Sequence, residues 1–455
     1  MKLRMPHTLA LLLAVMVLAL VATWLLPSGA YQMSEAANGQ KVVVPGTYAP
    51  LPDRTYLPPW TLFTIIPKAF ASAQGVIFFV ILMGGVFGVL QKTGAIEAAI
   101  GRTMIRFQGR QTLLIFFGMA IFTLLSASFG MASEYIAFTA MLVALCAAVR
   151  LDAMAASAIL LVGYGVGYGA STTNPFTVVV AQEIAGVPIG SGLWFRIVVL
   201  VLAFLIAFHH VWSYARRVRL DPTRALAPPP ADDKSTPSDF PPMTVTRGLV
   251  LGALGLTVAA LIAGIVLAKW SLPQVGALFL GLGFSAVLIA RIRIDEACDA
   301  FLAGAARLTG TALLVGVARA IGLILEDGQV LHTLVFMTAT PLAALPAEAS
   351  AVGMFLIQAF LNVFIPSGSG QAFATMPIMA PIGDLVGVSR QASVLAFQFG
   401  DGFTNLIIPT NPFLMAILGL TGVTYGAWVR FVWPLMVKLM LLSAAAMVAA
   451  VVVGL

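Results

Sequence analysis

The sequence contains few charged residues. Only 9% of its 455 residues are Asp, Glu, Lys or Arg, whereas 60% are hydrophobic and the mean hydropathy is +1.00. Soluble domains carry about 25% charged residues. Many of the apolar runs approach the roughly 20 residues that cross a bilayer as a helix. The composition excludes an ordinary soluble domain and predicts an all-α polytopic membrane protein.

Cysteine and histidine are also scarce. Cys146 and Cys298 are the two cysteines, and their separation gives neither a disulfide framework nor a metal knuckle. The adjacent His209 and His210 precede the basic segment "RRVR", and neighbouring helical residues do not share a face. We interpret this pair as an interfacial anchor rather than a metal site, and we expect no cofactor.

Motifs for chemistry on bound substrates are missing. The segment "PSGSGQ" (366–371) lacks the Lys-Ser/Thr of a phosphate-binding loop, and no Ser and His are spaced to suggest a catalytic triad. No aromatic-basic ladder indicates a nucleic-acid partner. The formal charge of +7 is assigned to loops beside membrane lipid. These absences argue against an enzyme and against nucleic-acid binding.

The basic residues predict how the chain is oriented. Lys2 and Arg4 precede an apolar run longer than the 7–15 residues of a cleaved signal peptide, so we expect a retained first span with a cytoplasmic N-terminus. Residues 214–246 are charged and Pro-rich and predict a cytoplasmic linker. The linker separates a first repeat, 1–213, from a second, 247–455. We expect a bacterial inner-membrane protein with a periplasmic C-terminus.

The two halves share a motif. "GYGVGYGASTTNPF" (163–176) and "GDGFTNLIIPTNPF" (400–413) carry G-x-G and T-N-P-F at the same spacing, offset by 237 residues (400 − 163). Apolar arms of about 15 residues rise roughly 22 Å, short of the ~30 Å hydrocarbon core. Segments of about 111–149 and 354–385 therefore predict re-entrant hairpins, which precede broken helices of about 153–186 and 391–420. The predicted fold is an inverted repeat of about nine full spans, two opposed hairpins and two broken helices.

The Asn-Pro pairs predict how each helix breaks. A residue before Pro avoids the helical conformation, Asn is a strong N-cap, and Pro favours the first helical position. We expect half-helices to end near Thr173 and Thr410 and to restart at Pro175 and Pro412. The restarted helix presents N–H groups suited to a carboxylate. Asn174 and its counterpart either cap the backbone or face a ligand, and a purely structural kink is the alternative.

The hairpin tips, the breaks and the ionisable residues at membrane depth provide the candidate site, because such ionisable residues are costly and usually functional. Arg319 either clamps a substrate carboxylate, neutralises Asp401 or neutralises a helix end. Glu134 and Asp401 suit a proton, Na⁺ or a cationic amine. We interpret the glycines of 163–169 as helix packing. Expected substrate contacts are Ser133, Glu134, Thr173, Asn174, Ser367, Gly368, Ser369, Gln371, Thr410, Asn411 and Arg319. Expected ion-coupling residues are Ser126, Ser128, Glu134, Ser171, Asn362, Asp401, Thr404 and Asn405.

Several segments resemble a known family. "GGVFGVLQKTGAIEAAI", "ASTTNPFTVVVAQEIAGVPIGSG" and "NVFIPSGSGQAFATMPIMAPIGDLVGVSRQASVLAFQFGDGFTN" are similar to the anaerobic C4-dicarboxylate carrier family, in its YfcC-like branch. The resemblance spans nearly the whole chain except the linker. It implies a scaffold domain that often forms a homodimer and a transport domain that moves like an elevator. It also implies substrate and cation sites at the tips and breaks, although "SASFGMASE" lacks the Asn of sodium-coupled relatives.

These observations favour a secondary active transporter for a small anionic or zwitterionic metabolite, driven by Na⁺, by H⁺ or by exchange. A C4-dicarboxylate suits two opposed half-helix N-termini together with Arg319, and we favour it slightly. A basic amino acid suits Glu134 and Asp401 in the same cavity and remains the alternative. A channel fits less well, because the predicted hairpins close the middle of the membrane.

Overall fold

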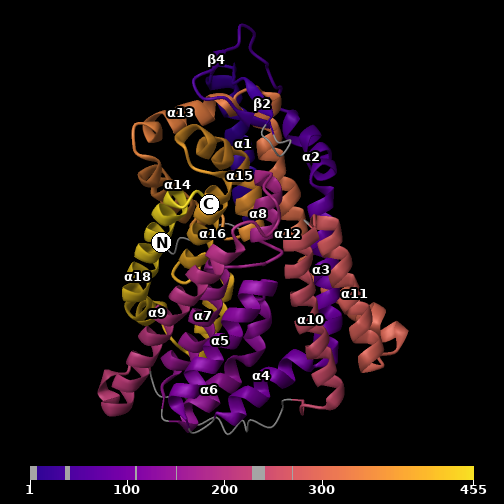
Figure 1. The fold of residues 1–455 in the computed structure, drawn as a ribbon, viewed down its shortest axis with the longest axis vertical. Helices are drawn as coiled ribbons and strands as arrows, with labels where there is room; N and C mark the ends of the chain where they lie inside the picture. The colour runs from indigo at the N-terminus through magenta and orange to yellow at the C-terminus, as the bar shows by residue number, and fades with distance from the viewer. Residues whose placement is uncertain (1–7, 36–40, 108–109, 150, 228–240, 269) are drawn as a thin grey trace.

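The computed structural model describes residues 8–35, 41–107, 110–149, 151–227, 241–268 and 270–455, and these residues are mostly helical (Figure 1). The first part of the chain contains α1 (Thr8–Leu25), β1 (Gly29–Ala30), β2 (Met33–Glu35), β3 (Lys41–Val43), β4 (Ala49–Pro50), α2 (Thr61–Ser72), α3 (Gln74–Thr93) and α4 (Ala95–Arg106). It continues with α5 (Gln111–Phe129), η1 (Ser133–Phe138), α6 (Thr139–Ala148), α7 (Ala153–Gly169), α8 (Val178–Ala185), α9 (Leu193–Leu220) and η2 (Pro222–Arg224). The second part contains α10 (Val245–Ala268), α11 (Leu272–Ala290), α12 (Ile294–Asp327), α13 (Leu331–Ala343), α14 (Ala347–Asn362), α15 (Gly368–Val386), α16 (Arg390–Thr404), α17 (Pro412–Thr421) and α18 (Tyr425–Val452).

The helices confirm the prediction of a helical membrane protein. Within the described ranges, six helices are long and apolar enough to cross a bilayer, namely α3, α5, α9, α11, α12 and α18. Many of their large apolar side chains face outward, as expected for surfaces in contact with lipid. The predicted total of nine full spans goes beyond what helix length and composition establish.

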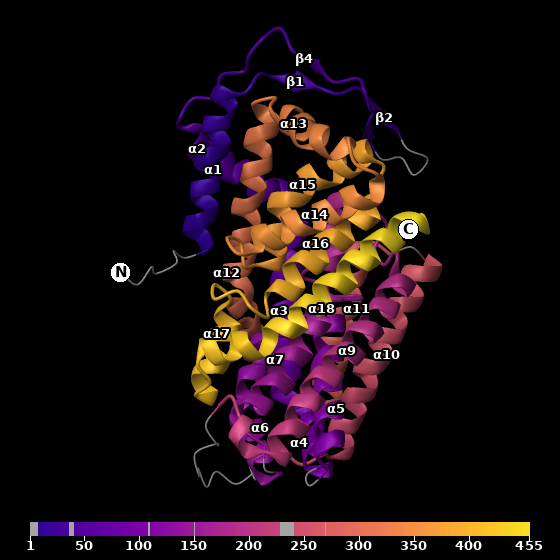
Figure 2. The same ribbon diagram turned by 90° about the vertical axis from the view of Figure 1, so that its left-hand side faces the viewer.

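Helices α3 and α12 form a closely packed wall along one side of the bundle (Figures 1 and 2). Glycines permit this packing. A Cβ atom added at Gly304 would lie 2.2 Å from the carbonyl oxygen of Gly84 and 2.8 Å from the Cα atom of Gly88. Small residues that bring two helix backbones together are typical of membrane interfaces. The wall is therefore fixed by backbone contact and has little room to deform.

Both segments that were expected to form hairpins contain two arms. The first comprises α5, η1 and α6, and α5 ends at Gly130, whose φ of +69° suits glycine. The second comprises α14 and α15, and the Ser367 hydroxyl caps α15 by accepting a hydrogen bond from the Gly370 N–H. Helices α5 and α6 both pack against α7, and α14 packs against α16.

The breaks lie at the Asn-Pro pairs as predicted, but both breaks are longer than expected. Helix α17 begins at Pro412 as predicted, whereas α8 begins at Val178 and not at Pro175. The backbone of Thr177 is not helical (φ −125°, ψ −72°). Helices α7 and α16 end at Gly169 and Thr404 rather than near Thr173 and Thr410.

Hydrogen bonds explain the early end of α7. The Ser171 hydroxyl donates to the carbonyl oxygens of Gly167 and Tyr168 at 3.0 and 2.8 Å. The backbone N–H groups of Thr172 and Thr173 donate to the carbonyl oxygen of Ala127 in the first hairpin. These hydrogen bonds replace those of a continued helix, so α7 ends at Gly169.

The predicted linker is shorter than 214–246. Residues 214–220 continue α9, and α10 begins at Val245. Tyr214 is buried and its hydroxyl bonds to Asp152, so packing against the start of α7 extends the helix beyond its apolar part. Residues 228–240 of the predicted linker lie outside the described residues.

A small cap covers the end of the bundle that carries α13 (Figure 2). It consists of two antiparallel pairs, β1 with β4 and β2 with β3. The Tyr31 N–H donates to His332 Nδ1 at 3.1 Å, and the hydroxyls of Tyr48 and Thr333 are 3.0 Å apart. The segment between α1 and α2 is thus hydrogen-bonded to α13, which joins α12 to the second hairpin.

We expect Gly304→Ala to destabilise the protein, because its Cβ atom would collide with the backbone of α3. Overpacking of this kind costs about 1–3 kcal/mol. Gly310→Ala is the matched control, since Gly310 lies in the same helix and nothing lies within 4 Å of an added Cβ atom. Thermal melting of the purified variants measures the difference. Equal melting temperatures for the two variants would contradict the close packing of the wall.

Candidate functional site

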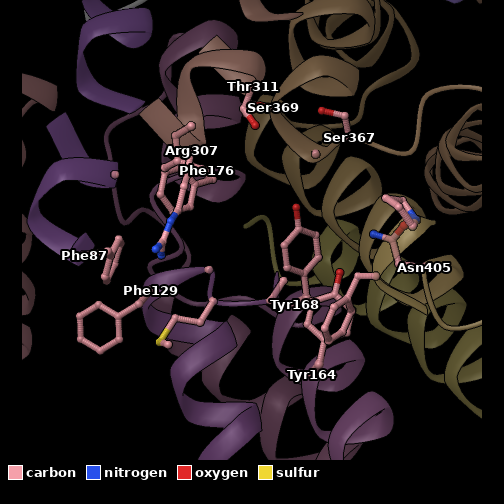
Figure 3. Close-up of a pocket in the computed structure, with 18 of the residues that line it drawn as sticks. Phe87, Phe129, Tyr164, Tyr168, Phe176, Arg307, Thr311, Ser367, Ser369 and Asn405 are labelled. Atoms are coloured by element: carbon pink, nitrogen blue, oxygen red, sulfur yellow. The ribbon is translucent and has the colours of Figure 1, made fainter. Parts of the chain in front are cut away.

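A cavity of about 450 Å³ lies between the α3–α12 wall and the elements that carry the two hairpin tips and the two breaks. Figure 3 shows its lining side chains converging from both sides. The wall contributes Gly84, Phe87, Gly88, Gln91, Gly304, Arg307, Leu308 and Thr311. The opposite side contributes Phe129, Gly130, Met131, Ala132, Tyr164, Tyr168, Phe176, Pro366, Ser367, Gly368, Ser369, Asn405, Asn411, Pro412 and Phe413.

The tip of the second hairpin is part of this lining. Ser367 is the N-cap of α15, and Gly368 and Ser369 begin its first turn, so the positive end of a 19-residue helix lies at the cavity. A Cβ atom at Gly368 would lie 2.5 Å from the Tyr168 hydroxyl and 2.9 Å from Asp401 Oδ2. Glycine is therefore required here, since it lets the tip approach Tyr168 and Asp401.

The second break is held by amide side chains. Asn411 Oδ1 accepts a hydrogen bond from the Phe413 N–H at 3.0 Å, and its Nδ2 donates to the Asn405 carbonyl oxygen at 2.9 Å. Asn362 Nδ2 donates to the Asp401 carbonyl oxygen at 2.7 Å, to Thr404 Oγ1 at 2.7 Å and to Asn405 Oδ1 at 3.1 Å. The structure thus brings together the four residues Asn362, Asp401, Thr404 and Asn405 that the sequence analysis grouped as ion-coupling residues.

The second hairpin is tied to the same break. The Thr410 hydroxyl donates to the carbonyl oxygen of Val363 at 3.1 Å. Val363 directly follows α14, the first arm of the hairpin. The break and the hairpin tip are therefore joined by a side-chain hydrogen bond as well as by packing.

The first break has a similar arrangement. Asn174 Oδ1 accepts from the Phe176 N–H at 2.8 Å, and its Nδ2 lies 3.4 Å from Ser171 Oγ. The Thr173 hydroxyl donates to the Ser128 carbonyl oxygen at 3.3 Å, and Ser126 Oγ donates to the Met131 carbonyl oxygen at 2.7 Å. Asn174 therefore caps backbone and does not line the cavity, whereas Asn411 does both.

Asp401 has an unusual environment. Its side chain is 0% exposed, and within the described part of the chain neither carboxyl oxygen receives a hydrogen bond of normal geometry, although the Asn405 side chain lies beside the group. Asn362 Oδ1, Gln371 Oε1, Gln398 Oε1 and Thr177 Oγ1 are also buried without a partner there. An unpaired buried acceptor costs free energy and indicates a functional group or a missing ligand. These oxygens suit a proton or a cation.

Besides Asn174, several predicted substrate residues do not line the cavity or cannot be placed, namely Thr173, Thr410, Gln371, Arg319, Ser133 and Glu134. Gln371 is 2.8 Å from Gln358 Oε1, so it joins the two arms of the second hairpin. The side chains of Ser133 and Glu134 lie outside what the structure describes, although their backbone forms part of η1.

Arg319 is not near Asp401 and does not line the central cavity. Its guanidinium pairs with Glu326 at 3.0 Å and with Ser72 Oγ at 3.1 Å. Arg307 and Arg319 both lie in α12. At 1.5 Å per residue, they are separated by about 18 Å along the helix axis. Of the three roles predicted for Arg319, neutralisation of Asp401 is wrong.

Arg307 and an aromatic surface were missed by the sequence analysis. Arg307 Nη1 donates to Gln91 Oε1 at 2.5 Å, and its guanidinium points into the cavity (Figure 3). Tyr164 and Tyr168 lie one helical turn apart, and the ring of Tyr164 packs 4.7 Å from that of Phe413. The spacing of the tyrosines inside "GYGVGYG" was the available signal.

The glycines of 163–169 pack against neighbouring helices as predicted. A Cβ atom at Gly167 would lie 2.2 Å from the Thr123 carbonyl oxygen, and one at Gly169 would lie 2.4 Å from the Phe403 ring. These contacts hold α7 between the first hairpin and α16. They also fix the direction in which Tyr164 and Tyr168 face.

A second cavity of about 460 Å³ lies between the same two groups of helices. It is lined by Ser72, Ala73, Gly75, Val76, Glu183, Ile184, Leu272, Arg319, Glu326, Phe373 and Pro377. Both cavities border α12 and α15. Arg307 of α12 lines the first cavity, and Arg319 of the same helix lines the second. The two cavities therefore lie at different depths along one interface.

Comparisons with known sequences cover nearly the whole chain. Residues 5–452 match the family model of the C4-dicarboxylate anaerobic carrier. The chain is 33% identical to "Putative basic amino acid antiporter YfcC" of Escherichia coli (strain K12), over 99% of this chain and 97% of that protein. It is 26% identical to an "Uncharacterized protein" of Haemophilus influenzae, over 96% and 95% of the two chains.

Two solved structures share the fold. The YdaH transporter of Alcanivorax borkumensis superimposes with a TM-score of 0.71 at 18% identity, covering 99% of each chain. MtrF of Neisseria gonorrhoeae, described as one of a class of antimetabolite efflux pumps, superimposes with a TM-score of 0.72 at 18% identity, covering 98% of this chain and 95% of that one. These similarities place the chain among membrane-transporter folds.

We expect Asp401→Asn to raise thermal stability, because it removes a buried charge that makes no hydrogen bond of normal geometry with the described residues. The gain should be about 1–3 kcal/mol. Asp384→Asn is the matched control and should lower stability, since Asp384 pairs with Arg390 at 2.8 Å and both side chains are mostly buried. Thermal melting of both variants checks the opposite signs. A loss of stability in Asp401→Asn would show that the carboxylate is satisfied in the native protein.

Proposed function

The chain belongs to the C4-dicarboxylate anaerobic carrier family, and we propose that it is a secondary active transporter that exchanges basic amino acids. Its substrate site is the cavity between the α3–α12 wall and the hairpin tips. One observation carries this proposal: the cavity combines the guanidinium of Arg307 with a carboxyl group, Asp401, that is buried directly behind Tyr168 and Gly368.

A basic amino acid needs groups of both signs. Arg307 and the first turn of α15 suit the α-carboxylate, through charge-assisted hydrogen bonds and helix N–H groups. Tyr164, Tyr168 and the nearby Phe413 present ring faces on which a cationic group is stabilised, and Asp401 supplies negative charge behind them. The name of the Escherichia coli relative supports the same substrate class.

A C4-dicarboxylate is the second candidate, and it is favoured by the family description. Its two carboxylates would use Arg307 together with the N-termini of α15 and α17, both of which reach the cavity. In this case Asp401 would be protonated during binding. The two candidates therefore differ in whether Asp401 acts as the partner of the substrate or only of the coupling ion.

We further propose that Asp401 carries the coupling charge. Asn362 fixes the backbone of Asp401 and the hydroxyl of Thr404 in one position. A proton on Asp401, or Na⁺ held by its carboxylate and the unpartnered oxygen of Asn362, would cancel the cost of the buried charge. When no substrate or coupling ion is bound, the charge on Asp401 would make movement of the site across the membrane unfavourable. The site would therefore return only with a second substrate bound, which gives exchange.

The motion that we propose is a displacement of the hairpins and broken helices along the wall, as in an elevator. The two cavities at different depths along α12 support this motion. The similar construction of the two halves supports it as well, because each half provides one hairpin tip, one break that contains an Asn and a hydrogen bond between them. A channel would instead require an open path through the hairpins.

Proteoliposomes distinguish the substrates directly. We expect labelled arginine to enter saturably only when the vesicles contain an unlabelled basic amino acid, with no competition from succinate. Arg307→Gln should weaken apparent affinity by roughly 10- to 100-fold, as expected for loss of a hydrogen bond to a charged group. Saturable succinate uptake without arginine uptake would favour the dicarboxylate candidate. Non-saturable flux that no gradient influences would contradict a transporter of either kind.

The caps at the breaks give a second prediction. Asn411→Ala removes an N-cap and should cost about 1 kcal/mol of stability and abolish exchange, because Asn411 also faces the cavity. Ser389→Ala is the matched control: Ser389 caps α16 by accepting from the Ala392 N–H and does not line the cavity. It should show a similar loss of stability with exchange retained. Wild-type exchange by Asn411→Ala would mean that this break is only a kink.

A further inference from the structure

A basic cavity lies away from the transport site, at the end of the bundle where α9 leads into η2. It has a volume of about 220 Å³ and lies between α9, η2 and the first turns of α18. Arginines from all three elements line it, namely Arg217, Arg224 and Arg430. All three side chains are exposed, and among the residues that the structure describes no acidic side chain lines this cavity.

Two of these arginines lack an acidic partner. Arg224 pairs with Asp221 at 3.0 Å, and hydrogen bonds from Thr223, and from Arg224 itself, hold the pKa of the Asp221 carboxyl below its usual range. Arg217 and Arg430, in contrast, form no ion pair with any residue in the described ranges. The cavity therefore has an excess of positive charge.

The walls of the cavity are rigid. The Tyr214 hydroxyl bonds to Asp152 and accepts from the Leu226 N–H at 3.0 Å. The imidazole of His210 lies 3.0 Å from the carbonyl oxygen of Phe431. These bonds join α9, the start of α7, the segment after η2 and α18. The arginines are thus carried by elements that are hydrogen-bonded to one another.

An apolar strip continues from this cavity along α18. Arg430 shares one helical face with Trp433, Val437 and Leu441, which are 59%, 44% and 66% exposed. From Arg430 to Leu441 the strip rises about 16 Å, which is comparable to an extended acyl chain. A charged end with an adjacent apolar strip matches the shape of a phospholipid.

We propose that this cavity binds the phosphodiester headgroup of an anionic phospholipid, with an acyl chain along the exposed face of α18. Basic pockets between membrane helices are suited to such headgroups, and Trp433 is of the residue type that is enriched at membrane interfaces. Since α18 packs against α14 and α16, the lipid would stabilise the group of helices that holds the second break.

Lipid titration of the purified full-length protein tests this proposal. Cardiolipin and phosphatidylglycerol should raise the melting temperature in a saturable manner, whereas phosphatidylcholine and inorganic phosphate should not. The double variant Arg217→Gln, Arg430→Gln should weaken the apparent lipid affinity by roughly 30-fold, because each guanidinium near a membrane surface contributes about 1 kcal/mol. Native mass spectrometry of retained lipid provides a second readout.

The control is the double variant Arg291→Gln, Arg293→Gln. It removes the same charge from the exposed connection between α11 and α12 and should keep the wild-type lipid response. An equal loss in both double variants would overturn the site, because it would reflect net charge alone. An equal response to phosphatidylcholine would overturn the role of headgroup charge. Stabilisation by inorganic phosphate as strong as that by cardiolipin would overturn the assignment to a lipid.

Discussion

A chain that leaves the helical conformation inside a bilayer must satisfy its backbone within the protein, because hydrocarbon offers no hydrogen bonds. This constraint governs the centre of the structure. At each break an Asn side chain caps the polypeptide, and a Thr hydroxyl bonds to the hairpin of the same half. The breaks and the hairpin tips are therefore mutually dependent.

The same constraint separates rigid from adaptable parts. The α3–α12 wall has unbroken helices whose glycines bring the backbones into contact, so it offers a fixed surface. Opposite this wall, two breaks and two tips expose polar groups to a cavity. A buried Asp401 that makes no hydrogen bond of normal geometry within the described ranges costs stability in the empty protein. Such a cost is expected where a site gains its full complement of charges only when ligand or coupling ion is bound.

The sequence predicted the parts of the site that follow from local chemistry. The position of both breaks and the start of α17 at Pro412 follow from the properties of Asn and Pro, whereas α5, at 19 residues, is longer than the arm of about 15 residues on which the first hairpin was predicted. The start of α8 at Val178 did not follow, because Asn174 forms a local turn that delays the helix, and this depends on contacts with α5. Arg319 was singled out because it is ionisable at apparent membrane depth. Arg307 was missed because only the packing of α12 against α3 shows which arginine faces the cavity.

The aromatic lining of the cavity could not be predicted from the sequence for a related reason. Tyr164 and Tyr168 lie within a glycine-rich run of α7. The glycines pack against other helices as predicted, whereas the two tyrosines lie on a different face of the same helix and line the cavity. Which face meets the cavity depends on α16 and on the first hairpin, which are distant in sequence. Local pattern therefore predicts where the helices are broken, while tertiary packing decides which side chains a substrate meets.

Substrate protection of a cysteine introduced at Ser369 tests the central claim most directly. The natural Cys298 is exposed on α12 and is not among the residues that line the cavity, so it serves as an internal control. If the cavity binds substrate, arginine should slow maleimide labelling of Ser369→Cys in a saturable manner and leave labelling of Cys298 unchanged. Equal labelling rates at Ser369→Cys with and without any exchanged substrate would contradict the assignment of this cavity as the transport site.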